Sequence, residues 1–228
     1  DPLALLRHRE STGLRDYWSY VPGGNNPDDG HREYSQLMSS SLALISDHIL
    51  ETYPLGDYRG LVDVAGGTGH FARMVKKRYP DIDATVLDLP EVVSEAKRQF
   101  PQTDIRFVAT DMFRSPLPPD TECFSLVRVL HDHDDEPVVA LLTRLHSALK
   151  PGGHLLIAEP MAGTAGAEPI GDTYFSFYLW AMGSGRPRTA KELKAMCLAA
   201  GFSGIREFKT PIPALTRVLV AEKAPKNP

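Results

Sequence analysis

A glycine-rich turn between a predicted strand and a predicted helix constrains the fold of this chain more than any other feature. Residues 61–72 read LVDVAGGTGHFA, so an apolar run leads into three glycines and a helical pattern follows at once. Gly66, Gly67 and Gly69 can adopt turn conformations that other residues avoid, and they let a ligand approach the main chain closely. A unit of this kind is typical of the doubly wound α/β sheets that bind nucleotides.

Strands and helices alternate along the rest of the chain. Apolar runs predict strands at 61–65, 84–88, 105–109, 123–130, 154–159, 204–209 and 215–222. Helical spacing, together with a stop and turn at KPGG, predicts helices at 34–52, 69–79, 90–99, 135–149, 171–183 and 189–201. The connection between the last two strands is so short that they must pair antiparallel. We therefore expect an α/β fold with a seven-stranded, mostly parallel sheet that ends in an antiparallel hairpin and is preceded by amino-terminal helices.

The composition argues against several classes of protein. The 228 residues carry a formal net charge of −4 and no cluster of lysine and arginine, so we expect no nucleic-acid partner. The only cysteines, Cys123 and Cys197, indicate a reducing compartment without a disulfide framework. No apolar run reaches the roughly 20 residues of a transmembrane helix, and no signal peptide is visible. We expect a cytoplasmic protein without a transmembrane segment, and contact with a membrane surface stays open.

Two acids near the glycine turn indicate which nucleoside-containing ligand it holds. Asp88 ends the second predicted strand, 19 residues after Gly69, where a carboxylate suits the hydroxyls of a ribose. The spacing of Gly67, Gly69 and Ala72 also satisfies the dinucleotide pattern, so the glycines alone leave NAD open. Asp63 lies inside the first strand, where its charge would repel the pyrophosphate of NAD but attract the sulfonium and ammonium groups of S-adenosylmethionine.

A third acid follows the third predicted strand. Residues 110–113 read TDMF, so Asp111 and Met112 can hold an adenine, the acid at its amino group and the thioether on its face. Leu89 and Phe113, next to these residues, complete the expected cofactor-binding set. Acids at three successive strands favour S-adenosylmethionine over a nicotinamide cofactor.

The fourth predicted strand leads into HDHDDE at 131–136. Ligands of open α/β sheets bind outside the carboxyl ends of the strands, so His131 should face the same crevice as the glycine turn. It can act as a general base towards a substrate hydroxyl. It can also bind a metal together with His133, or lie in a solvated turn in which Asp134 or Asp135 caps the next helix. We favour the general base for His131 and the solvated turn for His133, and we expect no metal.

Glu159 ends the fifth predicted strand and is expected to point towards the same crevice. A carboxylate there can orient His131 or steady its imidazolium form, as a carboxylate partner does in other base-assisted sites. The alternative is that Glu159 only binds backbone amides of a loop. We favour the first interpretation and take His131 and Glu159 as the candidate catalytic residues.

Short motifs in a fixed order carry a resemblance to a known family. They are VDVAGGTG at 62–69, LDLP at 87–90, TDMF at 110–113, VLHDHDDE at 129–136 and RPRT at 186–189. Together they resemble the S-adenosylmethionine-dependent O-methyltransferases of the plant and bacterial small-molecule type. Further stretches within 125–135 and 158–189 are similar to the members that methylate carotenoid hydroxyls. The resemblance covers residues 34–224 and implies a Rossmann-like class I methyltransferase fold with S-adenosylmethionine as its cofactor.

Carried over position by position, the resemblance assigns His131 as the base and Asp88 to the ribose. It assigns Asp111 and Met112 to the adenine, and the three glycines to the methionine part of the cofactor.

The sequence also departs from the family pattern at three positions. Val127 stands in place of a common lysine, His133 in place of the usual tryptophan, and Pro187 in place of a second acid. Members of the family carry an amino-terminal dimerisation domain, and this sequence shows no match to it. We therefore interpret 1–53 as an amino-terminal helical segment, a remnant of or linker to that domain, and 54–228 as the S-adenosylmethionine-binding catalytic domain. The full-length protein is expected to be a homodimer.

An aromatic helix indicates a hydrophobic substrate. Residues 172–182 read DTYFSFYLWAM, and five of the chain's 19 aromatic residues fall within seven positions. Core packing accounts for most of them, but Tyr174, Tyr178, Trp180 and Met182 can line a crevice for a long hydrophobic acceptor. The resemblance implies a hydroxylated carotenoid. The alternatives are a phenolic or chlorophyll-precursor substrate, a nicotinamide-dependent oxidoreductase, or a non-catalytic cofactor binder.

Overall fold

A seven-stranded sheet forms the centre of the protein in the computed structural model, which describes residues 42–226. Its strands are β1 (Gly60–Val64), β2 (Asp83–Asp88), β3 (Arg106–Ala109), β4 (Thr121–Val127), β5 (Leu149–Glu159), β6 (Ser203–Phe208) and β7 (Arg217–Glu222). They lie in the order β3-β2-β1-β4-β5-β7-β6. Strands β1 to β5 run parallel, and β7 pairs antiparallel with β5 and β6. The predicted mostly parallel sheet with its antiparallel hairpin is confirmed.

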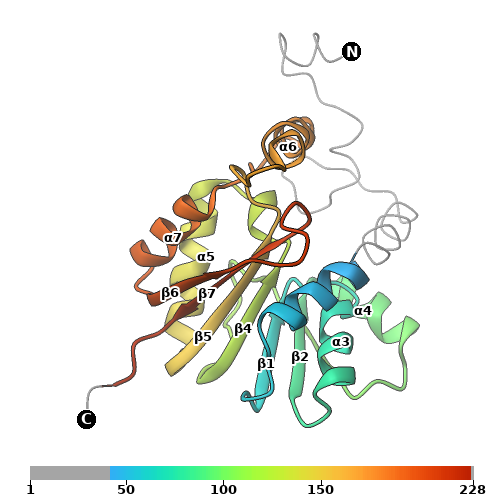
Figure 1. The fold of residues 1–228 in the computed structure, drawn as a ribbon. Coiled ribbons are helices and arrows are strands. Elements are labelled where there is room, and N and C mark those ends of the chain that lie inside the picture. The colour runs from blue at the N-terminus through green and yellow to red at the C-terminus, as the bar shows by residue number, and fades with distance from the viewer. Residues whose placement is uncertain (1–41, 227–228) are drawn as a thin grey trace.

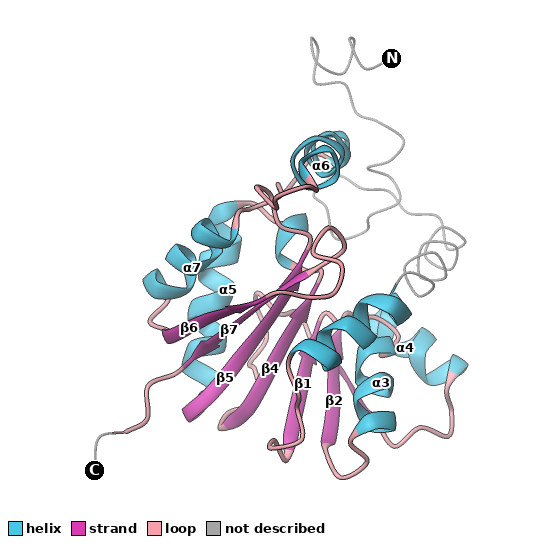
Figure 2. Cartoon of the chain, viewed as in Figure 1, coloured by secondary structure: helices cyan, strands magenta, loops and turns pink. Residues whose placement is uncertain are grey.

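Helices cover both faces of this sheet (Figures 1 and 2). They are α3 (His70–Arg78), α4 (Pro90–Gln99), α5 (Asp135–Ala148), α6 (Phe175–Met182) and α7 (Ala190–Ala199), with a 3₁₀ turn η2 (Leu130–Asp132) and a π-helical segment η3 (Pro169–Tyr174). On one face, α5 and α7 bury a cluster that includes Leu141 and Leu145. On the other, α3 and the helical residues 42–52 bury a second cluster that includes Ile45 and Ile49. Each such side chain contributes about 1.5–3 kcal/mol when it is fully buried.

Residues 42–52 therefore pack into the core of the sheet domain. The predicted helix 34–52 is described from residue 42 onward, and its earlier part lies outside the described residues. The proposed domain boundary at residue 53 stays a prediction. Among the described residues, no helix has both the length and the apolar character that a membrane crossing requires.

Three predicted elements differ from those observed by more than two residues at a boundary or are split. β4 ends at Val127 and not at residue 130, because Arg128 adopts a positive φ of 58° that ends the extended chain. β5 starts at Leu149 and not at residue 154, because Leu149 already pairs with Thr121 and the register shifts before His154 pairs with Cys123. The predicted helix 171–183 is split into η3 and α6. The first difference matters for function, because it places His131 on η2 beyond the end of β4.

The strand order reverses direction between β1 and β4, which are neighbours in the sheet. The glycine turn follows β1, and η2 follows β4, so both segments leave the same edge of the sheet side by side. In open α/β folds a reversal of this kind forms the crevice that binds ligands. Figure 1 shows α6 beyond this same end of β4 and β5.

Candidate active site

The glycine turn is a tight loop whose conformation depends on missing side chains. Gly67 and Gly69 have positive φ angles of 60° and 80°, which favour glycine. A Cβ atom at Gly66 would lie 2.4 Å from Oδ2 of Asp63, and one at Gly69 would lie 2.8 Å from Cζ of Phe107. The turn thus brings bare main chain close to the buried Asp63 carboxylate.

Asp63 is a buried acid with one unpartnered oxygen. It is 1% exposed, and its Oδ1 accepts a hydrogen bond from Ser125 Oγ at 2.6 Å. Its Oδ2 accepts none within the described part of the chain. Burial raises the pKa of this carboxyl to about 7, although Ser125 lowers it. A buried, unsatisfied carboxylate is costly, and a cationic ligand beside it would relieve that cost.

Asp88 stands at the end of β2 and faces the glycine turn. Its Oδ2 accepts from the backbone N–H of Gly67 and its Oδ1 from that of Leu89, both at 2.7 Å. Burial raises the pKa of Asp88 to about 6 despite these hydrogen bonds. The structure thus brings Asp88, Leu89 and the glycines together, as expected of one binding surface. The role of Asp88 towards a ribose stays a prediction.

The segment after β3 is held in place by its own turn and by α5. Asp111 Oδ1 accepts from the N–H of Phe113 at 2.8 Å. Arg144 on α5 donates to the carbonyl oxygens of Met112, at 3.2 Å, and of Ser115. Met112 and Phe113 are half-buried against the core. The adenine-binding role assigned to this segment stays a prediction.

His131 and Glu159 form a buried pair at the carboxyl ends of β4 and β5. His131 is 6% exposed and Glu159 2% exposed. His131 Nδ1 is hydrogen-bonded to Oε2 of Glu159. The other carboxylate oxygen, Oε1, accepts from the backbone N–H groups of Val129 at 2.9 Å and Leu130 at 2.7 Å. The same carboxylate therefore binds the loop amides and the imidazole, and its catalytic role stays a prediction.

The charge of the imidazole is set by its neighbours. Burial lowers the pKa of His131, and the positive charge of Arg128 lowers it further. The carboxylates of Asp132 and Glu159 have the larger combined effect, so the pKa of His131 is raised. Nε2 of His131 lies 3.2 Å from Oδ1 of Asp132. An ionised carboxylate only accepts hydrogen bonds, so Glu159 keeps a proton on Nδ1 and leaves Nε2 as the nitrogen that can exchange its proton.

His133 has a different environment from His131. Burial lowers its pKa to about 4, and its ring packs edge-on against Phe113 with centroids 5.0 Å apart. It is part of a packed cluster, and the solvated turn that we expected for it is not observed. Within residues 42–226, no group of three or more histidine, cysteine, aspartate or glutamate residues is arranged to hold a metal ion.

The aromatic helix reaches the candidate base through a residue that sequence reasoning passed over. Phe175, at the start of α6, packs its ring edge-on against His131 with centroids 5.9 Å apart. Tyr174 is 60% exposed and stacks on Tyr178. Met182 is fully buried in the core.

Trp180 on α6 is half-buried and packs against Phe177. The substrate-lining role of Tyr174, Tyr178, Trp180 and Met182 stays a prediction.

Two further residues of the site were not anticipated. Ser125 is paired with Asp63 across β1 and β4, a relation visible only once the strand order is known. Asp132 belongs to the segment 131–136, for which a solvated turn is one expectation, yet it is buried beside His131. Its position directly after the histidine was the only available signal.

The comparisons with known proteins agree with this geometry. Residues 13–203 match the model of the O-methyltransferase domain family. The chain is 42% identical to demethylspheroidene O-methyltransferase of Rhodobacter capsulatus over 98% of this chain and 57% of that protein. It is 36% identical to acetylserotonin O-methyltransferase of Mus musculus over 74% of this chain and 46% of that protein.

A solved structure shows the same fold. The crystal structure of human N-acetylserotonin methyltransferase in complex with SAM superposes with a TM-score of 0.87 at 25% identity, over 98% of this chain and 65% of that one. The sheet order and the antiparallel hairpin are thus those of a Rossmann-like methyltransferase fold. The chain spans 57% of the length of the Rhodobacter capsulatus relative. The chain belongs to the O-methyltransferase domain family.

Proposed function

We propose that this chain is the catalytic part of an S-adenosylmethionine-dependent O-methyltransferase that methylates a hydroxyl of a hydrophobic small molecule. The observation that carries the proposal is the His131–Glu159 pair, which is buried beside the glycine turn at the reversal of strand order. An imidazole whose Nδ1 is held by a carboxylate is poised to take a proton at Nε2. Family membership supports the same reaction.

The residues around the glycine turn fit a cofactor that carries positive charge. The unpartnered Oδ2 of Asp63 provides a negative site beside Gly66, and Asp88 provides a carboxylate at the next strand end. The human relative's structure holds SAM. When bound, S-adenosylmethionine supplies an electrophilic methyl group on a sulfonium. An NAD pyrophosphate would meet repulsion from Asp63 at this position, which disfavours the oxidoreductase alternative.

His131 would remove the proton of the acceptor hydroxyl as the oxygen is methylated. Its Nε2 takes that proton, and Glu159 stabilises the resulting imidazolium through Nδ1–H. An aliphatic alcohol is far less acidic than a phenol, so proton removal and methyl transfer should occur in one concerted step. A positioned base contributes about 10²–10⁴-fold to the rate.

The acceptor that we propose is a hydroxylated carotenoid. Two relatives, at 42% and 39% identity, are named demethylspheroidene O-methyltransferase. Phe175 forms an apolar wall against the base, and the half-buried ring of Tyr178 lies further along α6. Such a surface suits a long apolar chain that ends in one hydroxyl. The homodimer, the cytoplasmic location and the domain boundary stay predictions of the same proposal.

The test is mass spectrometry of products formed from methyl-labelled S-adenosylmethionine and a panel of a 1-hydroxycarotenoid and simple phenols, with the full natural chain. We expect one labelled methyl on the carotenoid, and its loss in His131→Asn. Methylation of the phenols alone would support the O-methyltransferase reaction and contradict the proposal that the acceptor is a carotenoid. Binding of the cofactor without transfer to any acceptor would support a non-catalytic binder. A change in the near-UV difference spectrum when NADH is added would support the oxidoreductase.

A further inference from the structure

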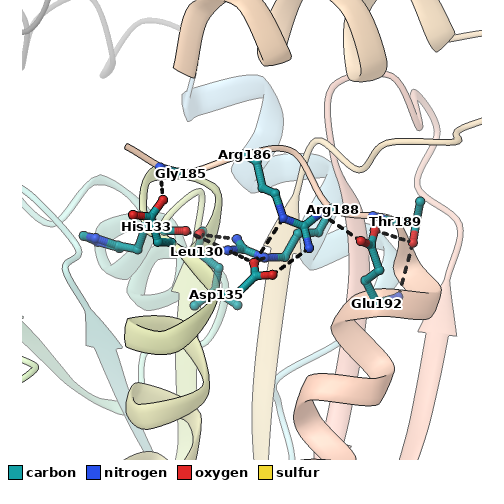
Figure 3. A network of polar contacts seen from close by, with 9 residues as sticks. Leu130, His133, Asp135, Gly185, Arg186, Arg188, Thr189 and Glu192 are labelled. Atoms are coloured by element: carbon teal, nitrogen blue, oxygen red, sulfur yellow. Dashed lines mark hydrogen bonds and ion pairs between the residues drawn. The ribbon is translucent and has the colours of Figure 1, made fainter. Parts of the chain in front are cut away.

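A buried arginine, Arg188, donates hydrogen bonds to the backbone of the turn that carries His131. Arg188 donates from Nη1 to the carbonyl oxygen of Leu130 at 2.8 Å and from Nη2 to that of His133 at 2.7 Å. These two carbonyls stand on either side of His131 in the chain. Figure 3 shows the guanidinium reaching both of them. One side chain therefore holds the main chain before and after the candidate base.

The segment that precedes Arg188 follows the same turn closely. Ser184 Oγ donates to the carbonyl oxygen of Asp132 at 2.7 Å. Gly185 has a φ of 78°, and a Cβ atom there would lie 2.1 Å from the carbonyl oxygen of His131. No other residue type fits at this distance. Residues 184–188 thus lie against the backbone of the turn along its length.

The guanidinium is oriented by an acid on α5. Asp135 Oδ1 accepts from Nε of Arg188 at 2.9 Å and from Nη2 at 2.7 Å. The Arg188 side chain is 1% exposed, so its charge is compensated by this one carboxylate and by carbonyl dipoles. A buried charge costs several kcal/mol unless it is paired and hydrogen-bonded. The planar fork of arginine can meet all three partners at once, whereas the ammonium of lysine cannot.

Arg186 provides a matched contrast two residues earlier. It also pairs with Asp135, at 2.9 Å, and with Glu192 at 2.8 Å. Its side chain is 41% exposed and lies next to Asp135 in Figure 3. Its contacts are with carboxylates, while those of Arg188 include the carbonyls of the turn.

Arg188 also anchors the loop that follows Glu159. Its own carbonyl oxygen accepts from the N–H of Ala162 at 3.0 Å, three residues beyond the carboxylate. The side chain of Arg188 therefore fixes the segment that carries His131, and its main chain fixes the segment that follows Glu159.

We propose that Arg188 is a positioning residue that holds the η2 turn so that Nδ1 of His131 meets Glu159 and Nε2 stays beside Asp132. The role rests on the proposed function of His131 as base. The turn has little structure of its own, since η2 is three residues long and follows Arg128 with its positive φ. A displacement of about 1 Å in a reacting group can cost about 10²-fold in rate.

The test compares Arg188→Gln and Arg188→Lys with Arg186→Gln in the full natural chain. We expect the Arg188 variants to lose about 10- to 100-fold in kcat. Their affinity for S-adenosylhomocysteine should stay within about twofold, and Arg186→Gln should retain kcat within about twofold. The second readout is the pKa of the His131 ring by NMR, assigned with His131→Asn.

The ring pKa distinguishes positioning from a general loss of stability. Asp132 and Glu159 raise the pKa of His131 against burial and Arg128, and the charge of His131 in turn lowers the pKa of the neighbouring His133. When the turn loosens, the pairing with Glu159 weakens, and the pKa should fall towards the ordinary value in the Arg188 variants. Global destabilisation alone would lower the folded fraction without moving the pKa of the folded form.

Three outcomes would overturn the proposal. They are an unchanged kcat and ring pKa in both Arg188 variants, equal effects of Arg186→Gln and Arg188→Gln, and failure of both Arg188 variants to fold while Arg186→Gln folds. The NMR readout needs no methyl acceptor. If no acceptor is methylated, the proposed function fails, and the ring pKa still decides whether Arg188 positions His131.

Discussion

Replacing Glu159 with glutamine should convert His131 into the wrong tautomer. Glu159 meets two backbone N–H groups on one oxygen and His131 Nδ1 on the other. Glutamine offers one accepting oxygen and one donating nitrogen. If its oxygen keeps the two N–H groups, its NH₂ faces Nδ1, which must then accept. The ring proton moves to Nε2, and the base can no longer take a proton from the acceptor.

The opposite orientation of the amide is the less stable one. It would place the NH₂ against two buried backbone donors, at a cost of about 1–3 kcal/mol for each unsatisfied group. The first orientation should therefore dominate. A positioned base is worth about 10²–10⁴-fold, so we expect kcat to fall by about 10²–10³-fold. This corresponds to roughly 3–4 kcal/mol in the activation barrier.

Glu122→Gln is the matched control for this prediction. Glu122 also accepts two backbone N–H groups, from Arg59 and Gly60, and pairs its other oxygen with the Lys150 ammonium, at the opposite end of β4. Loss of the Glu122 carboxylate charge should lower the free energy of unfolding without changing kcat. The assay is initial-rate transfer of labelled methyl, together with calorimetric binding of S-adenosylhomocysteine. If Glu159→Gln kept the kcat of Glu122→Gln, the assignment of Glu159 would be refuted.

Three other perturbations test the remaining parts of the site. Burial raises the pKa of Asp63 from 3.8 in its ordinary state to about 7. Between these two pKa values the folded form holds a proton that the unfolded form has released. The free energy of unfolding should therefore fall by roughly 4 kcal/mol as the pH rises from about 4 to 7. Urea unfolding at pH 5 and pH 8 should show roughly 2.5–3 kcal/mol of this loss, and Asp63→Asn should reduce it while weakening cofactor binding. Gly66→Ala should abolish cofactor binding, because its Cβ would lie 2.4 Å from Asp63, whereas Gly67→Ala, with nothing within 4 Å, meets only the strain of its positive φ. Calorimetry with S-adenosylhomocysteine separates the two, and equal losses would contradict the steric argument. Activity should rise with pH through the raised pKa of His131, and Asp132→Asn should move that rise to lower pH, since it removes one of the charges that raise the pKa. A pH–rate profile unchanged by Asp132→Asn would rule out this contribution.

Much of the fold follows from local patterns in the sequence. The run from 61 to 72 predicted a strand, a glycine turn and a helix, and β1 and α3 lie on either side of that turn. The short connection before the last strand required an antiparallel pair, and β6 and β7 form one. These predictions succeed because hydrophobic periodicity and glycine chemistry act over a few neighbouring residues.

The candidate base could also be found in the sequence, but its setting could not. His131 follows an apolar strand, and this order alone places it near the carboxyl edge of a parallel sheet. β4 stops at Val127 because Arg128 adopts a positive φ, and no local sequence pattern predicts that conformation.

Tertiary structure alone decided how the base is held. Arg188 lies 57 residues beyond His131 in the chain, and sequence reasoning noted it only as part of a family motif. Its burial, its pairing with Asp135 and its two bonds to the turn arise where the N-terminal ends of α5 and α7 meet. A buried charge must find partners wherever the fold supplies them. The sequence by itself determined which groups can do chemistry, and the packing of distant segments determined their orientation, because orientation depends on contacts that no local pattern contains.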